Sequence, residues 1–183
     1  GAAACSAGCG EPTVRPSLSL LPPNRPLAYS DADWSAVLLN HVREGLVDYD
    51  GLLMNREPLE RYYALVSQTG PTRTPDAFAS PPAATAYWIN VYNALVLRAV
   101  LEHYPVSTMY DLALPRLEHD YTFRVDGQIV NLAQIEARML KDSMQDARTL
   151  LATSRAALGA PRLMSEPMRA DTLENQLARA AAD

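Results

Sequence analysis

The longest hydrophobic stretch of the chain runs over about residues 82–104, and its hydrophobic positions surround the helix that its length predicts. A helix that is hydrophobic all round is either buried at the centre of a protein or spans a membrane. About 20 hydrophobic residues can cross a bilayer, but this stretch also contains Asn90, Asn93 and Arg98. Such polar groups are costly in hydrocarbon. We therefore predict a buried central helix over about residues 82–104, capped by Ser80.

Shorter helices are predicted on both sides of this stretch by hydrophobic residues three and four positions apart. They cover residues 31–44, 57–68, 106–112, 132–141 and 172–181, with a weaker helical pattern over 143–158. Residues 121–125 alternate like a strand, Asp126-Gly127 is typical of a hairpin turn, and residues 128–130 return. Residues 46–51 are expected to be an extended piece with a turn, and residues 115–120 a loop.

Together these elements predict a mainly α (α+β) fold, a helical domain around the buried central helix with one small β-hairpin over about residues 121–130. The first 28 residues differ from the rest because they are rich in Ala, Gly, Ser and Pro, and prolines oppose regular structure. A chain of 183 residues is long enough for one domain and a tail. We predict a disordered tail over residues 1–28 and a single domain over residues 29–183.

The composition excludes several functions. The net charge of −5 gives no electrostatic footprint for nucleic acid, and no Gly-rich phosphate loop or dinucleotide motif indicates a cofactor. Cys5 and Cys9 both lie in the first ten residues, so the predicted domain has no cysteine nucleophile, disulfide or Cys-rich zinc site. Glu118-His119-Asp120 is interpreted as a solvated loop, and no metal site is predicted. His41 is expected to be exposed and His103 to pack or cap at the end of the central helix.

The start of the chain, Gly1-Ala2-Ala3-Ala4-Cys5-Ser6, resembles the end of a bacterial lipoprotein signal, in which small residues precede the cysteine that is cut and acylated. No positively charged, hydrophobic signal core precedes it in the given sequence. The segment would therefore be the remaining end of a signal whose preceding residues have been removed. A lipid on Cys5, export without a lipid, and an incidental Ala-rich tail all stay open. The first alternative predicts an exported protein, periplasmic or anchored to the outer membrane, that touches the membrane only through its lipid.

Asn90 and Asn93 are three residues apart and therefore share one face of the central helix. A buried amide without partners costs about 1–3 kcal/mol, so both must find partners. One alternative is that they bind backbone groups of a crossing segment. The other is that they line a pocket and bind a ligand together with Tyr92, which packing in the core would equally explain.

Several short motifs occur in a defined order along residues 34–177. They are Val47-Asp48-Tyr49, the block from Ala86 to Leu95 with its Trp-Ile-Asn-x-Tyr-Asn core, His103-Tyr104-Pro105-Val106-Ser107, Gly127, Asn131-Leu132-Ala133-Gln134-Ile135-Glu136 and Asp146-Ala147-Arg148. In this order they resemble the family called Domain of Unknown Function 547 (DUF547). That name implies no established activity. Relatives commonly continue beyond the last residue of this chain, which leaves open a C-terminally truncated domain.

The chain departs from the family pattern at three positions. Relatives usually have His after the Ile-Glu pair, where this chain has Ala137, and His two residues after the Arg of the Asp-x-Arg motif, where it has Leu150. They usually have Cys in a Cys-Pro-x-Leu segment that here begins with Ala160. A thiol, a base and an orienting group are what nucleophilic catalysis needs. The resemblance therefore implies a fold whose reactive side chains have been replaced.

Two hypotheses follow. The first is an exported, non-catalytic binding or structural module with an unknown ligand or protein partner. The second is a hydrolase or acyl-transferase-like enzyme with a nucleophile other than Cys, for which the catalytic candidates are Glu136, Arg148, His119 and Ser154. A serine nucleophile needs a base within hydrogen-bond reach, and the chain has no Gly-x-Ser-x-Gly motif.

Overall fold

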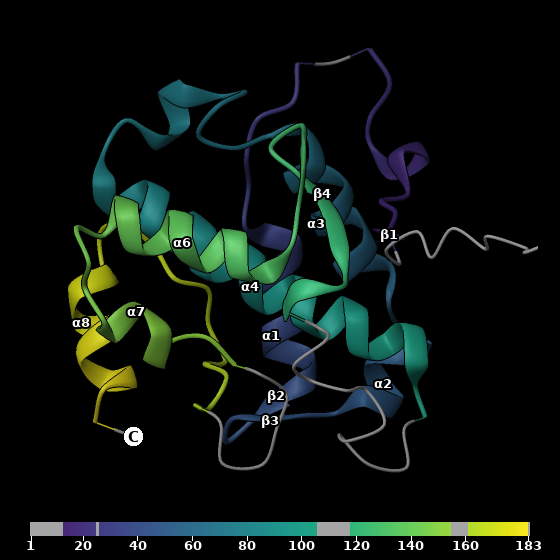
Figure 1. Ribbon diagram of the computed structural model, residues 1–183. Helices are drawn as coiled ribbons and strands as arrows, with labels where there is room; N and C mark the ends of the chain where they lie inside the picture. Colours follow the sequence, from purple (N-terminus) through teal and green to yellow (C-terminus); the bar gives the residue numbers. More distant parts are fainter. Residues whose placement is uncertain (1–12, 25, 106–117, 155–160, 183) are drawn as a thin grey trace, which may run out of the picture.

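One helix, α4 (Pro81–His103), organises the molecule. The computed structural model describes the chain except for residues 1–12, 25, 106–117, 155–160 and 183. Figure 1 shows α4 running behind α6 and across the molecule, from α7 and α8 on one side to α2 on the other. The fold is mainly helical with small sheets, which confirms the predicted α+β class.

The start of α4 follows the predicted cap. The side chain of Ser80 accepts a hydrogen bond from the Ala83 N–H, and prolines occupy the first turn, where no N–H is needed. Every residue from Ala84 to Leu101 is buried, so the predicted central helix is confirmed. Among the described residues, no helix combines the length and hydrophobicity that crossing a bilayer requires.

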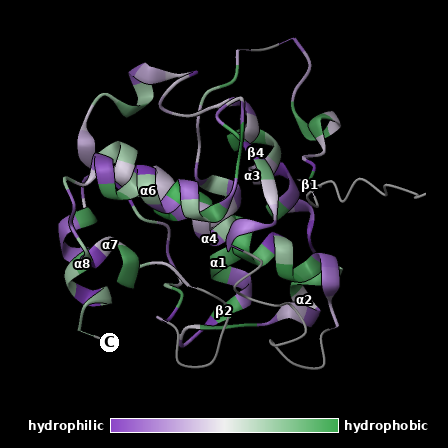
Figure 2. Cartoon of the chain, viewed as in Figure 1, coloured by the Kyte–Doolittle hydropathy of each residue, from purple (hydrophilic) through white to green (hydrophobic). Residues whose placement is uncertain are grey.

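The remaining helices pack around α4 and are shorter. They are α1 (Ala32–His41), α2 (Tyr49–Met54), α3 (Glu57–Gln68), α6 (Leu132–Asp142), α7 (Arg148–Leu151) and α8 (Leu173–Ala180), with 3-10 turns η1 (Leu18–Leu20) and η2 (Pro75–Phe78). Hydrophobic and hydrophilic residues alternate along α6 and α8 (Figure 2), which is the pattern of helices that bury one face. Asn131 and Gln134 form a capping box that starts α6 where the sequence predicts it.

A buried ion pair joins α3 to α4. The Nε of Arg98 lies 2.8 Å from Oε1 of Glu60, and both side chains are almost fully buried. Glu102 and Arg56 add an ion pair on each side, at 2.6 and 2.5 Å. This network explains how a charged residue is accommodated within a helix that is otherwise buried among hydrophobic residues, because buried charges need partners.

Two small sheets complete the fold. Strands β4 (Thr122–Val125) and β5 (Gln128–Val130) form the predicted antiparallel hairpin, with Phe123 opposite Val130. Strand β1 (Thr13–Val14) pairs in parallel with β4, so the sheet order is β1-β4-β5. Strands β2 (Val42–Arg43) and β3 (Leu46–Val47) form a separate hairpin.

The N-terminal segment differs in part from its prediction. Residues 13–20 carry β1 and η1 although we expected prolines to prevent regular structure there. The reason is tertiary, since the hydroxyl of Tyr63 donates to the Val14 carbonyl and accepts from the Arg124 N–H at 3.2 Å. Burial raises the pKa of Tyr63 to about 12, so the hydroxyl keeps the proton that it donates.

Several predicted boundaries are corrected. The first helix ends at His41 instead of residue 44, because Val42–Arg43 turns through the left-handed Gly45 to pair with β3. Residues 46–51 combine a strand with the start of α2, which Asp48 caps, and within 143–158 the described helix is α7 alone. Glu118 and His119 are helical instead of loop. His41 is buried instead of exposed. The helix predicted over 106–112 lies outside the described residues.

The bridge made by Tyr63 generates a stability prediction. Tyr63→Phe removes one hydrogen bond to Val14 and one to Arg124, which is expected to lower the free energy of unfolding by about 1–3 kcal/mol. Urea denaturation measures the change. Tyr104→Phe is the matched control, because its hydroxyl donates to Asp50 at the surface and should matter less. Equal losses in both variants would contradict the assigned role of Tyr63.

Candidate functional site

The side-chain amide of Asn90 binds a crossing segment of backbone. Its Oδ1 accepts from the Met168 N–H at 2.8 Å and from Nε1 of Trp34 at 3.2 Å. Its Nδ2 donates to the Met168 carbonyl at 2.8 Å. Asn90 is 2% exposed, so these bonds supply the partners that a buried amide needs.

Asn93 does the same one turn further along α4. Its Nδ2 donates to the Ala152 carbonyl at 3.0 Å, and its Oδ1 accepts from the Ser154 N–H at 2.8 Å. Of the two alternatives raised by the sequence, binding to backbone is therefore observed for both amides. A ligand-binding role for Asn90, Tyr92 and Asn93 stays a prediction, and Tyr92 is fully buried in the core.

A third amide grips the same crossing segment from the opposite side. Gln176 of α8 accepts from the Arg169 N–H and donates to the Pro167 carbonyl, each at 2.9 Å. Residues 167–169 are thus held between Asn90 and Gln176. The chain that follows residue 154 and leads to residue 167 is anchored at both ends by side-chain amides.

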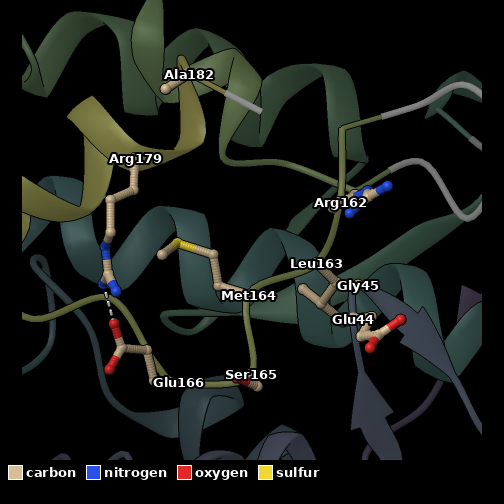
Figure 3. Close-up of a pocket in the computed structure, with 9 residues that line it drawn as sticks. All are labelled: Glu44, Gly45, Arg162, Leu163, Met164, Ser165, Glu166, Arg179 and Ala182. Atoms are coloured by element: carbon tan, nitrogen blue, oxygen red, sulfur yellow. Dashed lines mark hydrogen bonds and ion pairs between the residues drawn. The ribbon is translucent and has the colours of Figure 1, made fainter.

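The anchored segment lines an open cavity of about 450 Å³. Its walls come from three parts of the fold, as Figure 3 shows: the turn between β2 and β3, residues 162–166, and the end of α8. The lining residues are Glu44, Gly45, Arg162, Leu163, Met164, Ser165, Glu166, Arg179 and Ala182. We call this the 162–166 pocket.

Charges of both signs surround the 162–166 pocket. Glu166 forms an ion pair with Arg179, and this contact lowers the pKa of the Glu166 carboxyl. Arg162 makes no ion pair within the described part of the chain, and its stem lies against Gly45. A Cβ on Gly45 would lie 2.5 Å from the Arg162 Cβ, and Gly45 has φ +80°, so close approach and backbone conformation both require glycine.

The chemistry of this lining is limited. Its described residues include one hydroxyl, from Ser165, and neither a thiol nor an imidazole. A hydroxyl without a nearby base is a poor nucleophile. The lining can therefore hold a ligand by charge and hydrogen bonds, with the side chains of Leu163 and Met164 as its hydrophobic part.

The predicted catalytic candidates occupy separate places. Arg148 binds Asp146 at 2.7 Å and Glu174 at 2.6 Å, and these contacts lower the pKa values of both carboxyls. Glu136 lies on α6 and is half-buried. The His119 side chain is exposed, while its carbonyl accepts from Asn131.

Ser154 is buried, and its backbone N–H is bound by Asn93. No hydrogen bond joins Ser154 to His119 in the part of the chain that the structure describes. The described residues also contain no group of three His, Cys, Asp or Glu side chains placed to hold one metal ion. Cys5 lies outside the described residues.

Comparison with known proteins identifies the family. A family model described as "Protein of unknown function, DUF547" matches residues 77–183, more than half of the chain. The chain belongs to the DUF547 family. No curated protein and no solved structure matches it. The DUF547 match includes α4, Asn90, Asn93 and residues 162–166, whereas the turn at Gly45 that completes the pocket lies outside it.

Three residues of this DUF547 protein were missed by sequence reasoning: Gln176, Arg162 and Gly45. The contact between Gly45 and Arg162 joins segments more than 100 residues apart. Gln176 is one of several polar residues of α8, and its sequence position alone does not single out its amide as the one that binds residue 169. The one usable signal was Gly45 itself, since a left-handed glycine can mark close approach as well as termination.

The hydrogen bonds between Asn93 and the backbone generate a second stability prediction. Asn93→Ala leaves the Ala152 carbonyl and the Ser154 N–H without their partner, which is expected to cost about 2–4 kcal/mol of unfolding free energy. Hydrogen exchange at the Ser154 amide should also accelerate. Asn40→Ala on the exposed side of α1 is the control and should change little. An unchanged rate of hydrogen exchange at the Ser154 amide would contradict the role assigned to Asn93.

Proposed function

We propose that this DUF547 protein is a non-catalytic binding or structural module whose binding surface is the 162–166 pocket. The observation that carries the proposal is the lining of that pocket, in which the described residues offer two arginines and two glutamates but neither thiol nor imidazole. Such a lining suits recognition of a polar ligand by charge. Among the described lining residues, no nucleophile is paired with a base, which is what covalent catalysis requires.

The departures from the family pattern support the same proposal. The pocket follows directly on Ala160-Pro161, where the resemblance leads us to expect Cys-Pro, and Ala137 and Leu150 stand where it leads us to expect histidines. In this reading the fold still presents the segment, because the amides of Asn90 and Gln176 anchor it at residues 167–169. The presented segment binds instead of reacting.

The alternative is a hydrolase or acyl-transferase-like enzyme with a serine nucleophile. Ser154 and Ser165 favour it by flanking the altered segment. The exposed side chain of His119 and the commitment of Arg148 to Asp146 and Glu174 weigh against it, because neither adjoins these serines through a hydrogen bond among the described residues.

We further propose that the protein is exported and held at a bacterial membrane by a lipid on Cys5, in the periplasm or at the outer membrane. The small residues before Cys5 support this. Thr13 of β1 lies eight positions after Cys5, a reach of at most roughly 28 Å at about 3.5 Å per residue. A lipid on Cys5 would therefore keep the β1 side of the domain close to the membrane.

Labelling with a fluorophosphonate probe, which reacts with activated serines, distinguishes the module from the enzyme. Wild-type protein is expected to stay unlabelled, because the described lining of the pocket supplies no imidazole base. Ser154→Ala and Ser165→Ala are the matched variants. Labelling of the native wild type that disappears in either variant would overturn the non-catalytic reading.

The lipid anchor has its own test. Mass spectrometry of the full-length protein produced in a bacterium with lipoprotein processing should show a diacylglyceryl modification on Cys5. Cys5→Ala should abolish the modification and release the protein from the membrane fraction, while Cys9→Ala, four residues further on, should leave both unchanged. An unmodified Cys5 in the mature chain would rule the anchor out.

A further inference from the structure

A second cavity, of about 390 Å³, lies between the first turn of α4, the turn that joins α6 to α7, and the start of α8. It shares no lining residue with the 162–166 pocket. In Figure 1 these three elements meet on the side of the molecule opposite α2. A cavity of this volume is within the range of small-molecule sites.

Four carboxylates and one cation line this cavity. The carboxylates are those of Asp142, Asp146, Asp171 and Glu174, and the cation is Arg148. Arg148 forms ion pairs with both Asp146 and Glu174, so these three side chains together already carry one more negative than positive charge. Asp142 accepts from the neutral Nε1 of Trp88, and the structure describes no ion pair of Asp171. The lining thus has excess negative charge.

A threonine whose side chain is largely buried also lines this cavity. Thr85 lines it and is only 2% exposed, yet its side chain forms no hydrogen bond with any described residue. Buried polar groups normally have partners, so an unused hydroxyl at the cavity wall is available to a ligand, from which it can accept a hydrogen bond. Leu173, Leu177 and Pro82 supply a hydrophobic wall beside it.

We propose that this cavity binds an aliphatic ammonium compound. An ammonium group supplies three donors, which matches the Thr85 hydroxyl and the carboxylates, and a short alkyl chain matches the wall formed by Leu177 and Pro82. A metal ion fits less well, because no three carboxylate, imidazole or thiol groups of the described residues converge on one point. The same chemistry is present in a free alkyl diamine and in the lysine side chain of a protein partner.

The proposal is tested by titrating isotope-labelled full chain with 1,4-diaminobutane and following amide chemical shifts. Shifts are expected at residues around the cavity, weakening as salt is added because the attraction is ionic. Neutral 1,4-butanediol is the ligand control and should bind at least tenfold more weakly. Equal affinity for the diol would overturn the proposal.

Variants sharpen the test because they are expected to move affinity in opposite directions. Asp171→Asn, which breaks no described ion pair, and Thr85→Val should each weaken diamine binding about three- to tenfold. Arg148→Gln should strengthen it by a similar factor, since it releases Asp146 and Glu174. Asp50→Asn is the matched control on α2, near the far end of α4, where it contacts Tyr104.

Asp50→Asn should leave diamine binding unchanged, and the proposal fails if Asp171→Asn weakens binding no more than this control. A parallel titration with the peptide acetyl-Gly-Lys-Gly-amide separates the two sources of the ammonium. Tighter binding of the diamine assigns a free amine, and tighter binding of the peptide assigns a lysine of a protein partner. Binding of neither overturns the proposal, while leaving the 162–166 pocket untouched.

Discussion

The structure depends on side-chain amides that replace missing backbone partners inside the core. A helix buried on all sides satisfies its own backbone but offers nothing polar to the segments that cross it. The side-chain amides of Asn90 and Asn93 supply the missing hydrogen-bond partners where two segments cross α4, at Met168 and at residues 152–154. Without these amides, buried N–H and C=O groups of irregular chain would lie against hydrocarbon, which is costly.

This arrangement gives the Trp-Ile-Asn-x-Tyr-Asn block a physical meaning. Trp34 adds its indole N–H to Asn90, and Gln176 grips residues 167–169 from α8, so helices from both ends of the chain converge on one segment. The segment that precedes residue 167 is thereby presented at the surface by a rigid support. The same support could serve a reactive or an inert segment, so the scaffold and its chemistry can change independently.

The sequence predicted the parts of this fold that local periodicity controls. The α3 helix, the Ser80 cap, the Asp126-Gly127 hairpin and the capped start of α6 were all found, because spacing and turn chemistry specify them. The pairing of β1 with β4, the Glu60–Arg98 pair and the meeting of Gly45 with Arg162 were not. Each joins segments far apart in sequence, and a single sequence has no signal for such contacts.

The edge strand β1 illustrates what such distant contacts imply for folding order. Thr13 contacts Thr122 at a sequence separation of 109 residues, through a strand of two residues. Closing so long a loop costs conformational entropy, and the few hydrogen bonds of β1 do not offset that cost until the rest of the sheet has formed. β1 is therefore expected to dock last during folding and to detach first, so the N-terminal segment can come away from the domain while α4 and its neighbours stay intact.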